Sequence, residues 1–325
     1  MNSKSRIYKT INIREIEQIV KSAFDTDTTI DSWRELSGGL FNTTYFIKTL
    51  RPTKSLVLRI APIRQELLFD FEKVMMGIEP GLYKLFNDHN IPAPKVILYD
   101  ETHRILPRNY IITEYINSIT LNDPSFPGEH KSKIQYDLGV YTAKLHSIKS
   151  DKFGWPTPNN EVNGSHLWLD VVKKFVEEDA EKTSNHHVFS EKEIKEFNEF
   201  FRKNDHLFVN RERPSLVHND LWDPNILVHK VNQDWEIAAI IDADRAMYAD
   251  REFEFVLWGN DPHFMKGYGI GLDMSNEGIL RRKAYSLITG FFGAYVYKVQ
   301  YDNETAYIDT KNWVLDVLKD VMNNS

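Results

Sequence analysis

The stretch Leu216–Val228 reads LVHNDLWDPNILV, and it carries the most informative spacing in the chain. Within it, His218, Asp220 and Asn225 form an H-x-D-x-x-x-x-N pattern. An Asp-Pro-Asn tripeptide alone usually marks only a turn. The pattern gains meaning because another acid, Asp242, follows a second apolar run downstream.

Two short β-rich runs lie between Asn225 and Asp242. They are Ile226–His229 and Ile237–Ile241, separated by a polar segment, and they favour a β-hairpin that would hold Asn225 and Asp242 near each other. Phosphoryl transfer needs a carboxylate near the attacking hydroxyl and oxygen ligands for Mg²⁺. The residues therefore indicate Asp220 as a base, with Asn225 and Asp242 as metal ligands.

Outward from this stretch, the sequence pattern of the N-terminal part of the chain predicts a small sheet with a helix or two. A first amphipathic helix is indicated by apolar residues at Ile13, Ile16, Ile19, Val20 and Phe24. β-rich runs follow at Tyr45–Thr49, Leu56–Ile60 and Tyr110–Ile116. Between the last two runs, a helical pattern over residues 69–89 is interrupted by Pro80.

The rest of the chain is mostly helical. An apolar stripe is formed by Ile134, Leu138, Tyr141, Leu145 and Ile148. Ser190 and Glu193 make a capping box, which predicts that a helix begins there. A strand-rich part followed by a helical part predicts an α+β fold. We expect an N-terminal lobe over residues 1–116 and a C-terminal lobe over residues 117–325.

Composition narrows the classes of function. Lys and Arg number 40 against 47 Asp and Glu, a formal charge of −7, and no basic run is present, which argues against nucleic-acid binding. The absence of cysteine excludes disulfides and thiolate chemistry. The N-terminus lacks a signal-peptide pattern, and the longest apolar stretch, Leu287–Tyr297, is too short to cross a bilayer. We therefore expect a cytoplasmic protein with no membrane partner.

Seven segments follow one another in a characteristic order. They are LSGGLFNTTYFI (Leu36–Ile47), SLVLRIAP (Ser55–Pro62), IPAPKVILYDE (Ile91–Glu101), YIITEYINSITL (Tyr110–Leu121), DLGVYTAKLHSI (Asp137–Ile148), LVHNDLWDPNILV and IIDADRAMYADREFEFVLW (Ile240–Trp258). In this order and spacing, the chain resembles the aminoglycoside phosphotransferase and choline kinase superfamily. The resemblance implies a two-lobed protein-kinase-like fold, ATP and Mg²⁺ as cofactors, and a small-molecule hydroxyl as acceptor.

The resemblance also implies where the nucleotide binds. Gly38, Gly39 and Asn42 fall in the loop that covers the phosphates, although a Gly-Gly pair alone is usually a hairpin turn. Glycine there would permit positive φ and a close backbone approach. Glu114 and Ile116 fall in the hinge that would bind the nucleobase through backbone groups, and an ordinary buried strand is the alternative.

Two further positions are implied on the same basis. Arg59 stands where a protein kinase has lysine, and arginine can bind phosphate oxygens in a bidentate manner. Its expected partner is Glu79, but Glu79 precedes Pro80 and could instead be a helix N-cap. His218 is expected to buttress the loop rather than act as an acid or base, and Glu254 matches a structural acid of the family.

The acceptor is less well defined by the sequence. Acids crowd the region after the second β run, at Asp242, Asp244, Asp250, Glu252, Glu254 and Asp261. Asp244 and Glu252 could attract a cationic acceptor, or they could belong to an acidic helix start. Trp222 and Trp258 could contact an acceptor or pack in the core. An aminoglycoside-like acceptor is favoured, with a ketosamine, choline or homoserine as alternatives.

Other classes of protein fit less well. A catalytically silent nucleotide-binding protein has no need of Asp220, Asn225 and Asp242 together. A protein kinase is disfavoured because no APE-like segment lies between Asp242 and Glu254. A zinc hydrolase is disfavoured because His186–His187 lacks the i, i+4 spacing of a zinc site. The sequence predicts no oligomeric state.

Overall fold

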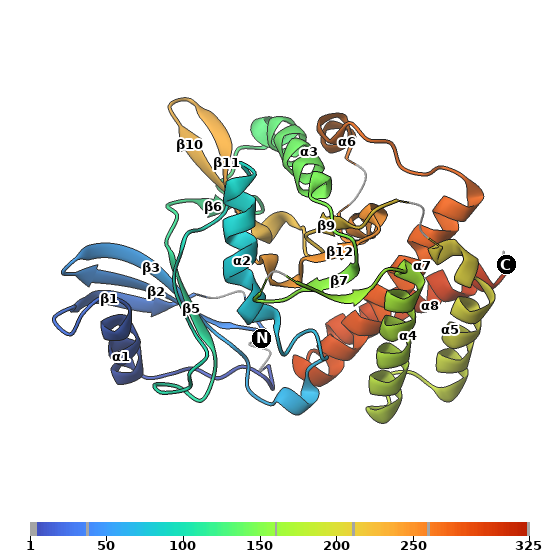
Figure 1. Ribbon diagram of the computed structural model, residues 1–325, viewed down its shortest axis with the longest axis horizontal. Helices are drawn as coiled ribbons and strands as arrows, with labels where there is room; N and C mark the ends of the chain where they lie inside the picture. Colours follow the sequence, from blue (N-terminus) through green and yellow to red (C-terminus); the bar gives the residue numbers. More distant parts are fainter. Residues whose placement is uncertain (1–4, 37–38, 160, 210–211, 259–260, 324–325) are drawn as a thin grey trace. The chain divides into compact units, whose positions relative to one another are not determined.

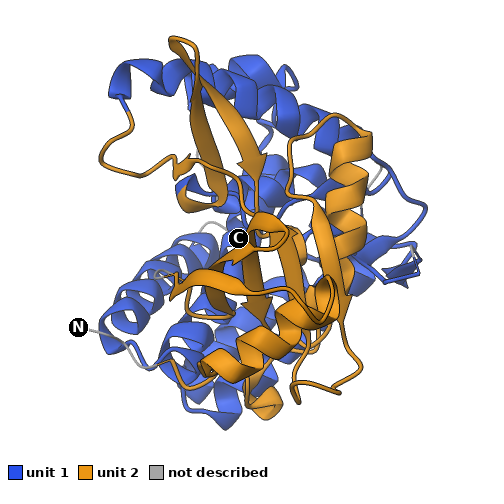
Figure 2. Ribbon diagram, turned by 90° about the vertical axis from the view of Figure 1, so that its left-hand side faces the viewer, with its two compact units in different colours: residues 1, 127–223, 245–325 blue, residues 2–126, 224–244 orange. Residues whose placement is uncertain are grey.

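The structure is a computed structural model that describes residues 5–36, 39–159, 161–209, 212–258 and 261–323. The chain divides into two compact units, shown in different colours in Figure 2. Unit 2 comprises residues 2–126 and 224–244, and unit 1 comprises residue 1 together with residues 127–223 and 245–325. The lobe boundary expected between residues 116 and 117 stays a prediction.

The described residues of unit 2 include a five-stranded antiparallel sheet and the α-helices α1 and α2 (Figure 1). The sheet order is β1-β2-β3-β5-β4. The strands are β1 (Ile30–Glu35), β2 (Thr43–Leu50), β3 (Thr53–Ile60), β4 (Val96–Asp100) and β5 (Tyr110–Glu114), and the helices are α1 (Ile13–Ala23) and α2 (Met75–Asp88). The predicted sheet and first helix are confirmed.

Alternation along β3 assigns its side chains to two faces of this sheet. Leu56, Leu58 and Ile60 are buried in a cluster with residues of α1. Successive side chains of a strand point to opposite faces, so Arg59 lies on the face away from that cluster. α2 continues through Pro80 because the proline is only the sixth helical residue, where the missing N–H costs one hydrogen bond.

A second, three-stranded sheet completes unit 2. Its order is β11-β10-β6, with β6 (Ile119–Thr120), β10 (Ile226–Val231) and β11 (Asp234–Ile240). β10 and β11 form the predicted hairpin, with Ile226 paired to Ile240 at its open end. This hairpin is joined to the N-terminal part of unit 2 by the Ile240 N–H, which donates to the carbonyl of Pro92 over 2.8 Å.

Unit 1 is mainly helical, with a four-stranded sheet of order β8-β7-β12-β9. Its helices are α3 (Lys131–Ser147), α4 (Trp168–Asn185), α5 (Glu191–Lys203), α6 (Pro262–Tyr268), α7 (Asn276–Tyr295) and α8 (Glu304–Asn323), with a π-helical turn at Val296–Gln300. The strands are β7 (Phe153–Pro156), β8 (Val162–Ser165), β9 (Ser215–Val217) and β12 (Met247–Ala249). α5 begins after Ser190 with the predicted capping box.

Close backbone packing joins α3 to α6. A Cβ atom added at Gly139 would lie 2.1 Å from the carbonyl oxygen of Phe264, and one added at Gly267 would lie 2.0 Å from that of Tyr136. Glycine is therefore needed at both positions. Among the described residues, no helix is long and apolar enough to span a membrane.

Candidate active site

The open end of the β10–β11 hairpin brings two predicted metal ligands together. The Ile241 N–H donates to the Asn225 carbonyl over 2.9 Å, which closes the hairpin immediately before Asp242. Asn225 is buried, whereas 36% of the Asp242 side chain is exposed. Asp242 has φ of 58°, a left-handed conformation that non-glycine residues seldom adopt and that often occurs at functional positions.

Three carboxylates surround the guanidinium of Arg59. Nη1 pairs with Glu79 through a very short contact, while Nη2 lies 2.8 Å from Asp242 Oδ1 and 3.1 Å from Asp244 Oδ2. α2 begins at Met75, so Glu79 lies inside the helix and the N-cap alternative is excluded. The Arg59–Glu79 pair expected from the sequence is present, and Asp242 and Asp244 extend it to a four-residue cluster within unit 2.

Burial and charge act in opposite directions on this cluster. Burial disfavours the charged form of Arg59, but the carboxylates of Asp242, Glu79 and Asp244 raise its pKa well above the ordinary value, so it stays cationic. Burial raises the pKa of Glu79 to about 7, against the lowering by Arg59, and the negative charges of Asp244 and Asp242 add to the rise. One guanidinium therefore does not balance three carboxylates, and the cluster favours a further cation.

Tyr83 was not identified from the sequence. Its hydroxyl accepts a hydrogen bond from the Asp242 N–H over 3.1 Å, and it is also hydrogen-bonded to Glu79. Tyr83 follows Glu79 by four residues in α2, so both side chains lie on one face of the helix. The i, i+4 spacing could have pointed to this tyrosine once Glu79 was placed in the helix.

The β1–β2 turn, residues 36–42, contains the predicted phosphate-covering positions. Gly38 lies outside the described residues. Gly39 is described, and an added Cβ there would make an ordinary 3.5 Å contact with the Asn42 carbonyl. The space around position 39 would therefore admit a Cβ atom, and the phosphate role of Gly39 stays a prediction. Asn42 is buried, and its Nδ2 lies 3.5 Å from Asp244 Oδ2.

The predicted hinge is the continuation of β5. The Glu114 N–H donates to the Lys95 carbonyl over 3.0 Å, and the Glu114 carboxylate accepts from the Lys95 N–H over 3.3 Å. The Ile116 carbonyl accepts from the Ser118 hydroxyl over 3.0 Å. Both hinge residues are half-buried, and nucleobase binding there stays a prediction.

The loop that carries Asp220 belongs to unit 1, and Glu254 holds it. The Glu254 carboxylate accepts from the backbone N–H of His218 over 2.6 Å and from that of Asn219 over 3.0 Å. Asn219 has φ of 59°, so the residue before Asp220 is held in a left-handed conformation. His218 is fully buried, and the buttressing role expected for it stays a prediction.

Glu254 is in turn supported by side chains from α3 and α6. His146 Nε2 lies 3.3 Å from the Glu254 carboxylate, and His146 Nδ1 lies 2.7 Å from the Tyr268 hydroxyl. Burial would raise the pKa of Glu254, but hydrogen bonding and charge from His146, together with His218, lower it below its ordinary value. Glu254 is therefore ionised near neutral pH. His146 and Tyr268 were not singled out from the sequence, because their partners are far along the chain.

The four predicted acceptor-binding residues differ in their surroundings. Trp222 is 51% exposed, whereas Trp258 is buried against Phe264, which favours the core alternative for Trp258. Glu252 is buried and forms ion pairs with Arg281 and Arg282 at 3.2 and 2.7 Å. Asp244 is buried in the Arg59 cluster. For Glu252 and Asp244 these contacts favour a structural role over attraction of an acceptor.

The donor atoms at the hairpin end fit Mg²⁺. No group of three or more His, Cys, Asp or Glu side chains within the described part of the chain is arranged to hold a metal ion. The candidates are thus the Asn225 amide oxygen and the Asp242 carboxylate, which are hard oxygen ligands. Mg²⁺ typically uses one or two such groups together with substrate phosphates.

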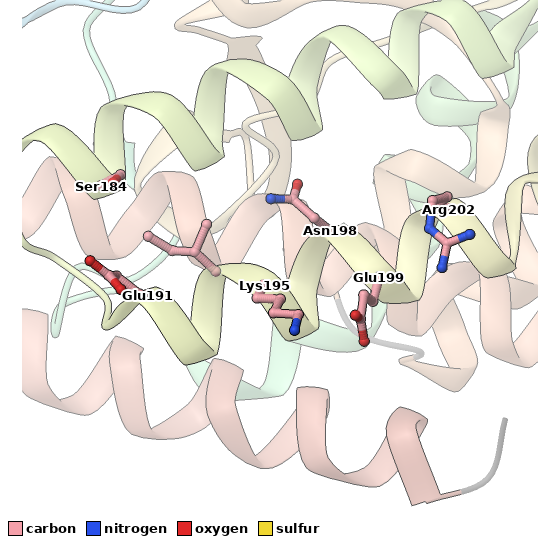
Figure 3. Close-up of a pocket in the computed structure, with 7 residues that line it drawn as sticks. Ser184, Glu191, Lys195, Asn198, Glu199 and Arg202 are labelled. Carbon is pink, nitrogen blue, oxygen red and sulfur yellow. The ribbon is translucent and has the colours of Figure 1, made fainter.

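A shallow hollow in unit 1 is separate from these positions (Figure 3). It has a volume of about 360 Å³ and is lined by Ser184, Glu191, Ile194, Lys195, Asn198, Glu199 and Arg202. Its two acidic and two basic side chains balance in charge. It contains none of the predicted site residues.

An antiparallel N-terminal sheet followed by a mainly helical part is the α+β fold of the kinase-like small-molecule phosphotransferases. A model of the phosphotransferase enzyme family matches residues 32–281, and the chain belongs to that family. The expected superfamily is therefore confirmed, as is the α+β kinase-like fold.

Individual relatives extend this result. A Staphylococcus aureus protein named "Probable ketoamine kinase" is 25% identical over 266 residues, which cover 78% of this chain and 83% of that protein. The aminoglycoside phosphotransferase APH(4)-Ia, solved as a thermostable mutant with AMP-PNP and hygromycin B, is 16% identical with a TM-score of 0.69 and coverage of 94% and 98%. A protein named as a fructosamine-3-kinase from Haemophilus somnus 129PT is 17% identical with a TM-score of 0.65 and coverage of 95% and 97%.

Proposed function

We propose that this kinase transfers the γ-phosphoryl group of ATP to a hydroxyl of a ketoamine. The observation that carries the phosphoryl-transfer chemistry is the pairing of Arg59 with Glu79 and Asp242 at the hairpin end that also bears Asn225. One side of this arrangement offers a cation for phosphate oxygens, and the other offers oxygen ligands for Mg²⁺.

Each residue then has a defined role. Asp220 accepts the proton of the attacking hydroxyl, and its loop is held in position by Glu254. Asn225 and Asp242 hold Mg²⁺, which when bound neutralises the charge of the transferring group. Arg59 orients the phosphates and stays charged at any working pH.

Two backbone segments complete the nucleotide site. The turn that contains Gly38, Gly39 and Asn42 covers the phosphates with its N–H groups. The hinge at Glu114–Ile116 binds the adenine. These assignments rest on the resemblance and on the position of both segments at the ends of sheet strands.

The charge distribution supports a ketoamine over a polycationic aminoglycoside. Asp244 is taken up by Arg59, and Glu252 by Arg281 and Arg282, so neither carboxylate is available to attract a polyamine. The exposed indole of Trp222, two residues after Asp220, could stack on a sugar ring. The relative named as a ketoamine kinase, similar over most of its length, supports the same acceptor.

The test is Mg²⁺-dependent ATP consumption with a panel of a fructosyl-amine, an aminoglycoside, choline and homoserine, with mass spectrometry of the product. We expect phosphorylation of the fructosyl-amine, and its loss in Asp220→Asn with nucleotide binding retained. Asp223→Asn, in the same loop, is the matched control. A stronger signal from another acceptor would overturn the ketoamine assignment, and full turnover by Asp220→Asn would overturn the role of Asp220.

A further inference from the structure

The segment Ser5–Ile11, here called the N-terminal strap, leads into α1 and is dark blue in Figure 1. It contacts the ends of strands β1 and β2 of unit 2. Ile7 is fully buried, and its carbonyl accepts from the Ile63 N–H over 2.8 Å. The Lys9 carbonyl accepts from Arg108 Nη1 over 3.1 Å. The strap is therefore anchored to the sheet at two points of its own backbone.

Three further hydrogen bonds join the strap to the β1–β2 turn. The Ser5 hydroxyl donates to the Leu40 carbonyl, inside the turn, over 2.9 Å. The Tyr8 hydroxyl donates to the carboxylate of Glu35, the last residue of β1, over 2.6 Å. On the other flank, the hydroxyl of Thr43, the first residue of β2, donates to the Lys9 carbonyl over 2.9 Å.

These bonds reach both flanks of the turn and one carbonyl within it. The strand pairing itself reaches the turn through the Leu36 N–H, which donates to the Thr44 carbonyl over 2.8 Å. The strap thus adds support where strand pairing ends. Burial and the hydrogen bond to Glu35 raise the pKa of Tyr8 above its usual range, so the phenol remains a donor at working pH.

We propose that Ser5 and Tyr8 are positioning residues for the nucleoside triphosphate, because they hold Leu40 and Glu35, described residues on either side of the proposed phosphate-covering position. This inference rests on the proposed function of that turn. A loop that is ordered before binding loses less conformational entropy on binding, so the ligand binds more tightly. The net contribution of one neutral hydrogen bond, such as that from Ser5 to Leu40, corresponds to about a fivefold change in an equilibrium constant. The bond from Tyr8 to the Glu35 carboxylate has a charged acceptor and corresponds to about a tenfold change.

The test compares Ser5→Ala and Tyr8→Phe with controls that remove the same kind of bond elsewhere in unit 2. Ser22→Ala removes a hydroxyl that donates to the Ile19 carbonyl on α1, and Tyr99→Phe removes a phenol that donates to Glu101. Two quantities are measured: the Kd of Mg²⁺-AMP-PNP by calorimetry, and hydrogen exchange of the amides of residues 39–44 without nucleotide.

We expect Ser5→Ala to raise the AMP-PNP Kd about fivefold and Tyr8→Phe to raise it about tenfold, and both to accelerate exchange at residues 39–44. For both variants, the KM of the acceptor and the melting temperature should match those of the control variants. Ser5→Thr, which keeps the hydroxyl, should bind AMP-PNP as tightly as the wild type. An unchanged Kd, or a change equal to that of the controls, overturns the proposal. If exchange accelerates but the wild type takes up no AMP-PNP, the proposed nucleotide site fails and the positioning role fails with it, while the strap still holds the turn.

Discussion

Replacement of Glu254 by glutamine tests whether the Glu254 carboxylate fixes the position of the loop that carries Asp220. The wild-type carboxylate accepts from two backbone N–H groups and from His146, and it is buried. A carboxamide has one acceptor oxygen, so its NH2 group must face at least one donor. The substitution keeps the shape of the side chain and changes only charge and hydrogen bonding.

The magnitude follows from the bonds that are lost. A hydrogen bond to a charged group contributes about 1.5–3 kcal/mol, and a buried donor left unsatisfied costs about 1–3 kcal/mol. We therefore expect about 3 kcal/mol less stability at neutral pH. The left-handed conformation of Asn219 costs about 1–2 kcal/mol and loses its support, so Asp220 should shift. A displacement of about 1 Å can reduce kcat about 100-fold.

The measurements are urea unfolding and steady-state kinetics with the acceptor that the wild type phosphorylates. The control is Glu181→Gln, at an exposed position on α4. The KM of ATP should change little. Because the pKa of Glu254 is lowered in the folded state, its stabilisation is present above its unfolded pKa of about 4.3 and is lost as pH falls. The stability gap between wild type and variant should therefore narrow in acid. Wild-type kcat and stability in Glu254→Gln would refute the reasoning.

Two other predictions concern buried charge. Arg59→Lys replaces a forked guanidinium that contacts three carboxylates by a single ammonium, which leaves at least one buried acceptor without its donor. We expect a loss of about 1–3 kcal/mol in stability and a raised KM for ATP; an unchanged unfolding free energy together with an unchanged KM would contradict this. Asp179 on α4 is buried, and burial followed by the charge of Glu178 raises its pKa well above the ordinary value. The contribution of Asp179 to stability is therefore complete below its unfolded pKa of about 4 and is lost as pH rises. Asp179→Asn should accordingly gain stability relative to wild type between pH 5 and pH 8. An equal difference in melting temperature between the two proteins at both pH values would exclude this.

Local sequence patterns predicted much of the fold. The β10–β11 hairpin, the capping box at Ser190 and the first helix follow from spacings of a few residues, and each is present in the structure. The order of the sequence blocks pointed to the family that the family model confirms. Such features are decided by neighbouring residues and can be recognised without knowledge of the tertiary structure.

Contacts between residues far apart in the chain could not be predicted from the sequence. His146 meets Tyr268 across 122 positions, and nothing local in either segment indicates the pairing. Asp244 was predicted to attract an acceptor, yet it is buried beside Arg59, which is 185 positions away in the sequence. The catalytic and binding roles of the individual site residues stay predictions, since contacts alone do not report chemistry.

The return of residues 224–244 to unit 2 has a practical consequence for dissecting this protein. A fragment that stops at residue 126 would encode Arg59 and Glu79 but not Asp242 and Asp244, and would lose the β10 and β11 strands that complete the second sheet. No single truncation can yield the whole unit. A minimal expression fragment would have to splice residues 224–244 behind residue 126 to keep Asp242 and Asp244 with Arg59.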